Sequence, residues 1–155
     1  MELIIQKTVE VGVKKITPVA MERCVVKLDE KDAKKKIDRW QKIAEVAAKQ
    51  SKRDIIPEIG NVISISNLYN KVNEYDVFIV AYEEEQQKTL KQVLKEYKNL
   101  KKIGVLIGTE GGIDIKEIES LKQNGAIIVT LGNRILRTET APIVIASNIV
   151  YELEN

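Results

Sequence analysis

Apolar residues follow two different patterns along this chain. The first has the period of a helix: between Asp32 and Lys52, apolar positions recur at alternating spacings of four and three, which places them on one helix face. These positions are Ala33, Ile37, Trp40, Ala44 and Ala47. The second pattern is a short, nearly continuous apolar run, typical of a strand buried on both faces of a sheet. Such runs lie at 76–82, 102–107 and 126–131.

Weaker patterns predict the remaining elements. We expect further helices at 2–11, 66–73, 84–97, 114–123 and 141–153, and further strands at 15–19 and 23–28. Strands that alternate with helices favour an α/β fold with a largely parallel sheet. The helix at 141–153 is apolar around most of its circumference, so we expect it to be buried, either within this chain or against a second copy.

Composition narrows the possible chemistry. A chain of 155 residues is expected to form one domain, 1–155. The absence of histidine excludes Ser-His-Asp catalysis and histidine zinc sites, and the single cysteine, Cys24, excludes an internal disulfide. No apolar run is long enough to span a bilayer and the N-terminus is not a secretory signal, so a cytoplasmic protein without membrane or metal is expected.

Positive charge is concentrated in one segment. Between Lys31 and Arg53, nine Lys and Arg face three acidic residues, an excess that suits a phosphate backbone. A solvated lysine-rich helix face is the alternative interpretation. Trp40 is expected to be a core residue rather than a base-stacking platform. The chain has only five arginines against twenty lysines, which suggests that arginine occurs where its planar fork must grip a ligand.

Three predicted strands end in segments that could bind a ligand, because ligands of open α/β sheets bind beyond the carboxyl ends of the strands. The segments are 81–83, 108–112 and 131–134. The second reads GTEGG, whose glycines permit close approach of backbone to a ligand. Its spacing matches neither a phosphate loop nor the dinucleotide-binding fingerprint, which argues against a dinucleotide-dependent oxidoreductase. A plain glycine-rich turn remains an alternative.

Two longer motifs resemble a known family. LGNRILRTETA (131–141) is similar to the L-G-x-R-I-L-R-T-E-T-A motif of RsmE-type methyltransferases, and IGTEGGI (107–113) to their I-G-P-E-G-G-F motif. Weaker matches lie upstream, and all five arginines fall on motif positions. The upstream matches are Lys7 with 10–13, Glu22-Arg23, Arg39-Trp40 and 50–53 with Pro57-Glu58. The resemblance covers essentially the whole chain in order.

The resemblance implies a fold and an activity that the patterns alone do not. RsmE-type enzymes are SPOUT-class proteins that methylate N3 of a uridine in 16S ribosomal RNA with S-adenosylmethionine. The resemblance therefore implies a SPOUT-type α/β fold, a deep C-terminal trefoil knot around the two motifs, and a homodimer. There are two alternatives. The chain could be an enzyme acting on another RNA, such as transfer RNA, or a non-catalytic RNA-binding relative.

The sequence departs from the family in three places. Thr109 replaces the proline of the glycine motif, and Ala48-Lys49 stand where a glutamate usually precedes Gln50-Ser51. The family's N-terminal PUA-like RNA-binding domain is also expected to be missing, because the resemblance to the methyltransferase domain starts at the beginning of this chain. The chain would then be either an isolated domain or a naturally short version, and in both cases we expect a reduced affinity for RNA.

Site residues are expected in the matched motifs, at the strand end of Tyr82 and in the basic segment around Lys35. The residues expected to bind S-adenosylmethionine are Tyr82, Ile107, Gly108, Glu110, Gly111, Gly112, Leu131, Gly132, Ile135 and Leu136. Those expected to bind RNA are Arg23, Lys35, Arg39, Arg53 and Arg134. Catalysis is expected from Arg53 or Arg137, which would stabilise a uracil anion, and from Glu139 as proton acceptor. Glu139 has an alternative role as an acidic residue near a helix N-terminus.

Overall fold

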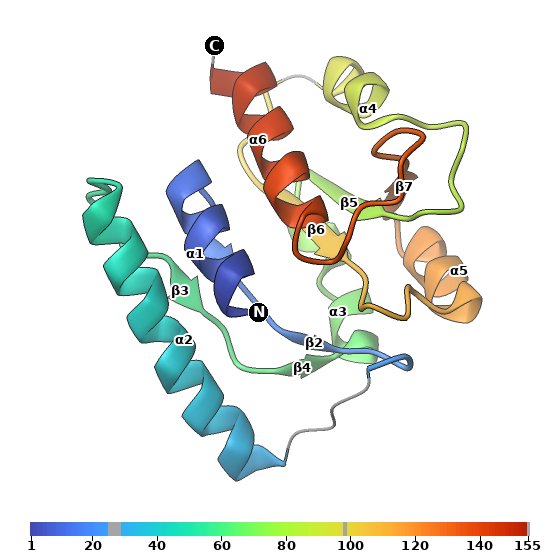
Figure 1. Ribbon diagram of the computed structural model, residues 1–155. Helices are drawn as coiled ribbons and strands as arrows, with labels where there is room; N and C mark the ends of the chain where they lie inside the picture. The colour runs from blue at the N-terminus through green and yellow to red at the C-terminus, as the bar shows by residue number, and fades with distance from the viewer. Residues whose placement is uncertain (25–28, 98, 155) are drawn as a thin grey trace.

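The computed structural model describes residues 1–24, 29–97 and 99–154. Two helices and short parallel strand pairs form one part of the molecule, and a three-stranded parallel sheet between helices forms the other (Figure 1). In chain order the elements are α1 (Glu2–Val11), β1 (Lys15–Ile16), β2 (Val19–Ala20), α2 (Glu30–Gln50), β3 (Glu58–Ile59), β4 (Ile63–Ser64), α3 (Ile65–Tyr69), the 3-10 helix η1 (Val72–Glu74), β5 (Val77–Ala81), α4 (Leu90–Glu96), β6 (Ile103–Ile107), α5 (Ile115–Gln123), β7 (Ile127–Val129) and α6 (Ala141–Glu154).

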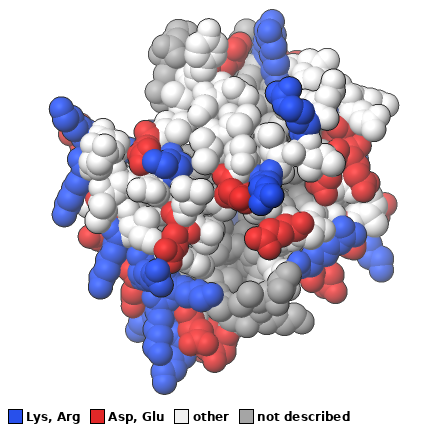
Figure 2. Space-filling model, in the orientation of Figure 1, with Lys and Arg blue, Asp and Glu red and all other residues white. Residues whose placement is uncertain are grey.

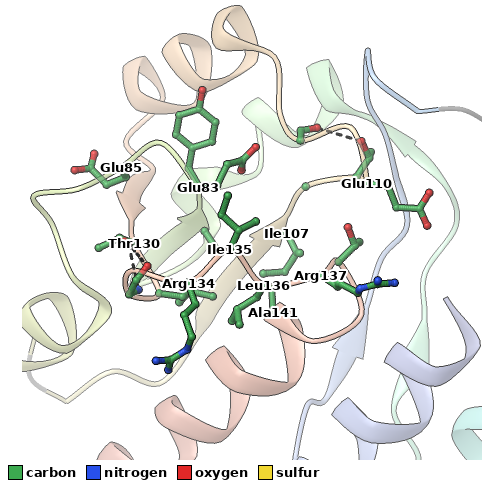
Figure 3. Close-up of a pocket in the computed structure, with 18 of the residues that line it drawn as sticks. Glu83, Glu85, Ile107, Glu110, Thr130, Arg134, Ile135, Leu136, Arg137 and Ala141 are labelled. Carbon is green, nitrogen blue, oxygen red and sulfur yellow. Dashed lines mark hydrogen bonds between the residues drawn. The ribbon is translucent and has the colours of Figure 1, made fainter.

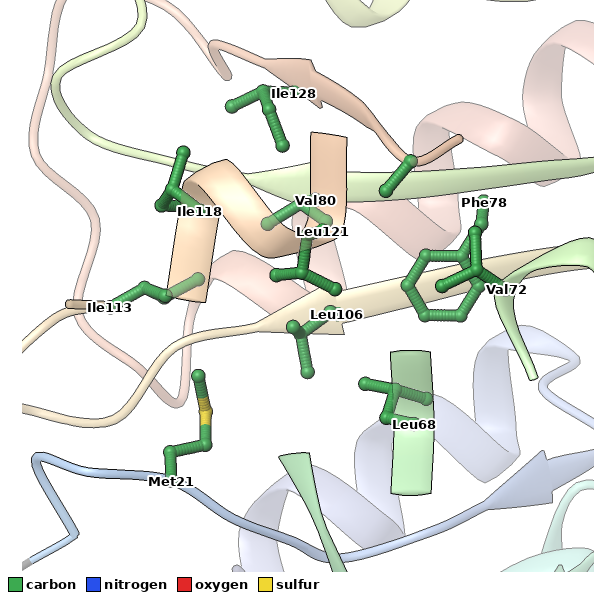
Figure 4. Close-up of a cluster of buried hydrophobic side chains, with 11 residues drawn as sticks. Met21, Leu68, Val72, Phe78, Val80, Leu106, Ile113, Ile118, Leu121 and Ile128 are labelled. Atoms are coloured by element: carbon green, nitrogen blue, oxygen red, sulfur yellow. The ribbon is translucent and has the colours of Figure 1, made fainter. Parts of the chain in front are cut away.

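The sheet that positions the site has the order β6-β5-β7, and β5 pairs in parallel with both neighbours. Its central strand is covered on both faces. Phe78 and Val80 pack with residues of α3 and α5 (Figure 4), whereas Val77 and Ile79 pack with residues of α4 and α6. Alternate residues of a strand point to opposite faces, so the continuous apolar run correctly predicted a strand buried on both sides.

A separate core joins α1 to α2. Trp40 is only 8% exposed and packs with Ile5 and Val9 of α1 and with the alanines of α2, which confirms the interpretation of Trp40 as a core residue. Helix α2 begins at Glu30. The carboxylate of Asp29 accepts a 2.7 Å hydrogen bond from the N–H of Asp32, which is a typical N-terminal cap.

Other boundaries differ from the prediction. The strand expected at 15–19 is split into β1 and β2 around Thr17-Pro18, and β3 and β4 were not predicted. Arg23 lies in a turn rather than a strand, and residues 25–28 of that predicted strand lie outside the described part of the chain. The helix expected at 66–73 is divided into α3 and η1.

The helix expected at 84–97 begins only at Leu90. The carboxylate of Glu85 accepts hydrogen bonds from the N–H groups of Gln87 and Lys88 at 2.8 and 3.2 Å, a local turn that competes with helical pairing. The N–H of Thr130 then donates to the carbonyl of Lys88 at 2.9 Å. The segment 84–89 is therefore a loop tied to the end of β7. The predicted knot and homodimer stay predictions.

Candidate active site

The carboxyl ends of β5, β6 and β7 open into one pocket of about 760 Å³. Residues from three chain segments, 81–86, 107–112 and 130–141, line it (Figure 3). The three segments that sequence analysis selected as strand ends therefore meet at a single site, as expected where parallel strands share one edge of a sheet.

Most residues expected to bind a cofactor line this pocket. They are Tyr82, Ile107, Gly108, Glu110, Gly112, Leu131, Gly132, Ile135 and Leu136. Gly111, also expected there, is not a lining residue. Their individual roles stay predictions.

Two glycines of the GTEGG loop disfavour a side chain, Gly112 through its backbone conformation and Gly108 through lack of space. Gly112 has a φ of +76°, a conformation that L-residues with side chains rarely adopt. A Cβ on Gly108 would stand 2.7 Å from Cγ1 of Ile113, whereas a Cβ on Gly111 would meet nothing closer than 3.4 Å. The loop thus depends on Gly108 and Gly112 but not on Gly111.

Thr109 holds this loop through its hydroxyl group. Oγ1 accepts a hydrogen bond from the N–H of Gly111 at 3.2 Å and lies 3.1 Å from the carbonyl oxygen of Gly112. The same oxygen lies 3.3 Å from the carbonyl of Arg23. At a position where the family motif has proline, hydrogen bonds therefore restrain the loop and tie it to the turn at 21–24.

The segment 131–140 forms the third wall. Gly132 has a φ of +112°, and its N–H donates to Oγ1 of Thr130 at 3.2 Å. Ile135 is 85% exposed and lines the pocket. The carbonyl of Arg137 then accepts hydrogen bonds from the N–H groups of Thr140 and Ala141, and α6 begins.

The five arginines have different environments. Arg134 and Arg137 are exposed and line the pocket with the half-buried Glu139. Arg53 lies elsewhere: its guanidinium donates hydrogen bonds to the carbonyls at the end of α1, at 2.8 Å to Val9 and 2.7 Å to Val13. The structure thus does not bring Arg53 to the pocket residues.

Besides Arg53, two more of the residues expected to contact RNA are held by acidic partners or backbone. Arg23 donates to the carbonyl of Gly111 at 3.1 Å and approaches Asp114 at 3.4 Å. Arg39 of α2 pairs with Glu2 of α1 at 2.9 Å. Lys35 is exposed on the same helix. Arg23 therefore supports the glycine loop, whereas Lys35 and Arg39 belong to a surface of α2.

The pocket carries more negative than positive charge, with four glutamates against two arginines. Burial is the main reason why the pKa of Tyr82 is raised, and its hydrogen bond to Glu84 and the charges of Glu84 and Glu83 add to the effect. The N–H groups of Gln87 and Lys88 lower the pKa of Glu85. A pocket of this kind favours a ligand that carries positive charge.

Sequence reasoning missed several lining residues. Glu83, Glu85, Thr109, Asn133 and Thr138 all line the pocket. Glu83, Thr109 and Asn133 lie within the three selected strand-end segments, whereas Glu85 and Thr138 lie beyond them, and nothing in residue type separates these five from ordinary loop residues. Within 1–24, 29–97 and 99–154, no cluster of three or more potential metal ligands occurs. Within the same ranges, no helix has the length and apolar character needed to cross a membrane.

Comparison with known proteins adds the family context. Residues 1–150 match the RNA methyltransferase domain family. The chain is 39% identical to ribosomal RNA small subunit methyltransferase E of Bacillus subtilis (strain 168), covering 99% of this chain and 62% of that protein. It is 34% identical to the protein of the same name in Mesomycoplasma hyopneumoniae (strain 232), covering 97% and 64%.

A solved structure of a protein with the same name is also similar to this chain. The crystal structure of ribosomal RNA small subunit methyltransferase E from Neisseria gonorrhoeae bound to S-adenosyl methionine matches with a TM-score of 0.84 at 32% identity, covering 97% of this chain and 60% of that one. In each of these comparisons the chain spans less than two thirds of the relative's length.

Proposed function

Because this chain belongs to the family of RNA methyltransferase domains, we propose that it transfers a methyl group from S-adenosylmethionine to N3 of a uridine in 16S ribosomal RNA. The observation that carries the proposal is the convergence of both family motifs, 107–113 and 131–141, on one pocket. Relatives named ribosomal RNA small subunit methyltransferase E support the substrate. A ribosomal RNA substrate makes the cytoplasm the site of the reaction.

The pocket residues suit S-adenosylmethionine. A volume of about 760 Å³ lies in the range of small-molecule sites. The backbone of Gly108 and Gly112 approaches without side chains, and Leu131, Ile135 and Leu136 offer apolar walls. The cofactor, when bound, supplies an electrophilic methyl group on a cationic sulfonium.

Two lining residues are candidates for catalysis. Uracil N3 must lose its proton before its electron pair can bond to the methyl carbon. We assign the stabilisation of the resulting uracil anion to the guanidinium of Arg137 and the acceptance of the N3 proton to Glu139. Both line the pocket, close to each other in the chain. Arg53 is not included, since its guanidinium is bonded to the end of α1.

The basic face of α2 is the proposed contact for RNA outside the pocket. Lys and Arg side chains gather over this helix, along the left edge in Figure 2. Lys34, Lys35 and Lys42 are exposed there, so they are available to phosphates. Arg134 at the pocket rim would contact the target nucleotide's neighbours. If α2 binds RNA, replacing these three lysines with glutamate will weaken RNA binding and make the binding constant depend less steeply on salt concentration.

A homodimer is the proposed assembly. Along α6, Ile149 and Val150 are only half-buried and Leu153 is 40% exposed. Next to α6, helix α1 exposes Leu3 to 50%. These apolar side chains suit burial against a second copy. Light scattering should give twice the mass of the chain.

Two measurements test the activity. In calorimetry, the chain is expected to bind one equivalent of S-adenosylmethionine, and no heat at millimolar ligand would refute the cofactor assignment. The second incubates the chain with small ribosomal subunits that lack the modification. Mass spectrometry should then detect N3-methyluridine in 16S rRNA. When transfer RNA is present in an equal amount, it should stay unmodified. Methylation of transfer RNA alone would contradict the substrate.

A further inference from the structure

Three consecutive glutamates follow β5, and the structure separates their roles. Glu84 accepts a 3.0 Å hydrogen bond from the hydroxyl of Tyr82. Glu85 accepts hydrogen bonds from the backbone N–H groups two and three residues later, at 2.8 and 3.2 Å. These two carboxylates therefore have partners within their own loop.

Glu83 has a different position. It lines the pocket and is exposed, and no residue in the described part of the chain donates a hydrogen bond to it (Figure 3). Its Oε1 lies 2.5 Å from the point where a Cβ on Gly112 would stand, so the carboxylate lies directly against the glycine loop. Nη1 of Arg23 lies 3.7 Å from the same point, but this guanidinium is bonded to Gly111. Glu83 thus remains available to a ligand.

The position of β5 indicates which part of a ligand Glu83 meets. β5 is the central strand of the sheet, so its end lies between the segments that follow β6 and β7. A ligand that reaches both flanking segments presents its middle to the end of β5. In S-adenosylmethionine the middle is the sulfonium, which joins the nucleoside to the amino-acid part.

We propose that Glu83 interacts with the sulfonium charge of the cofactor and so favours the methyl donor over the demethylated product. This inference rests on the proposed function. Methyl transfer returns the electron pair of the broken carbon–sulfur bond to sulfur, so the product is a neutral thioether. The amino and carboxylate groups are common to donor and product. A carboxylate beside the sulfur therefore discriminates between the two ligands, whereas one beside the amino group does not.

The expected effect is modest because Glu83 is exposed. Ion pairs in contact with water change an affinity by about 2- to 5-fold, and salt screens them. The preference for the donor should therefore decrease as the salt concentration rises, even in the unaltered protein.

The experiment compares two ligands by calorimetry, S-adenosylmethionine and S-adenosylhomocysteine, on the full chain. Glu83→Gln keeps the shape of the side chain and removes its charge. We expect this variant to bind the donor about 2- to 5-fold more weakly and to bind S-adenosylhomocysteine as before. Glu84→Gln is the matched control, since Glu84 is the adjacent glutamate and does not line the pocket. The ratio of this variant's affinities for S-adenosylmethionine and S-adenosylhomocysteine should equal that of the unaltered protein.

Other outcomes overturn the inference. Equal weakening of both ligands by Glu83→Gln would assign Glu83 to the amino group, and equal affinities for the variant and the unaltered protein would leave it no role. A ratio that does not depend on salt in the unaltered protein would also contradict the inference, without any variant. If the unaltered chain binds neither ligand, the proposed function itself fails, so the two failures can be told apart.

Discussion

The guanidinium of Arg23 donates a 3.1 Å hydrogen bond to the carbonyl of Gly111, 88 residues later in the chain. A second connection runs beside it, from the N–H of Glu22 to the buried carboxylate of Glu117 at 2.8 Å. Met21 anchors the same turn in the core below the sheet (Figure 4). The glycine loop of the pocket is therefore held from outside by a turn near the N-terminus.

The hydroxyl of Thr109 takes part in the same connection. Thr109→Val keeps the shape but removes hydrogen bonds to the loop and to Arg23, so we expect about 1 kcal/mol less stability and weaker binding of S-adenosylmethionine. Thr109→Ser keeps the hydroxyl and should behave as the unaltered protein. Thermal unfolding and calorimetry give both quantities, and equal results for Val and Ser would refute the role of the hydroxyl.

The two adjacent glycines of the loop should respond differently to alanine. Gly112→Ala places a side chain at a φ of +76°, which strains the loop, so we expect at least a 10-fold loss of cofactor affinity, or about 1.4 kcal/mol. Gly111→Ala has room for the added carbon and should lose less than about 3-fold. Similar losses in both variants, measured by calorimetry, would contradict this description of the loop.

Arg53 is expected to stabilise the fold rather than the reaction. Arg53→Ala removes hydrogen bonds to the carbonyls of Val9, Gly12 and Val13, which should cost about 1–3 kcal/mol of unfolding free energy. Denaturant unfolding measures this cost, with the exposed Lys49→Ala as a control that should change little. If Arg53→Ala is folded and binds RNA and cofactor normally but no longer transfers the methyl group, Arg53 has a catalytic role and the structural assignment is wrong.

Asp76 should make stability depend on pH in the acidic range. The N–H groups of Lys102 and Lys101 hydrogen-bond its carboxylate and lower its pKa. A lowered pKa in the folded state contributes stability above the unfolded pKa of about 4, and this contribution is lost as the pH falls through the folded pKa. Asp76→Asn should therefore melt at a lower temperature than the unaltered protein at pH 7, with the difference shrinking toward pH 3. A constant difference would contradict the assignment.

Sequence patterns predicted the sheet well and the loops poorly, for physical reasons. β5 is buried on both faces, and burial requires the apolar run that revealed it. The run at 102–107 predicted strand β6 correctly but not its burial, because Val105 on one of its faces is 37% exposed. β3 and β4 have two residues each, too few for any period. The loop at 84–89 looked helical because its residues favour helices, but the Glu85 carboxylate pairs with backbone N–H groups instead.

The site was predictable at the level of segments but not of side chains. Parallel strands bring their carboxyl ends to one edge, so the three segments could be selected in advance. Residue type could not separate Arg53, bonded to the end of α1, from Arg137 at the pocket. It also could not separate Glu83 from Glu84, because that difference depends on a tyrosine hydroxyl and a glycine loop brought together by folding.

The central claim is that the pocket at the ends of β5, β6 and β7 binds S-adenosylmethionine. A crystal structure of this chain grown with S-adenosylmethionine tests it most directly. We predict density for the cofactor between the glycine loop at 108–112 and the segment at 131–136, with its sulfur on the side of Glu83 and its methyl group facing Arg137. Cofactor bound at any other place on the chain, or an empty pocket at saturating cofactor, would contradict the claim.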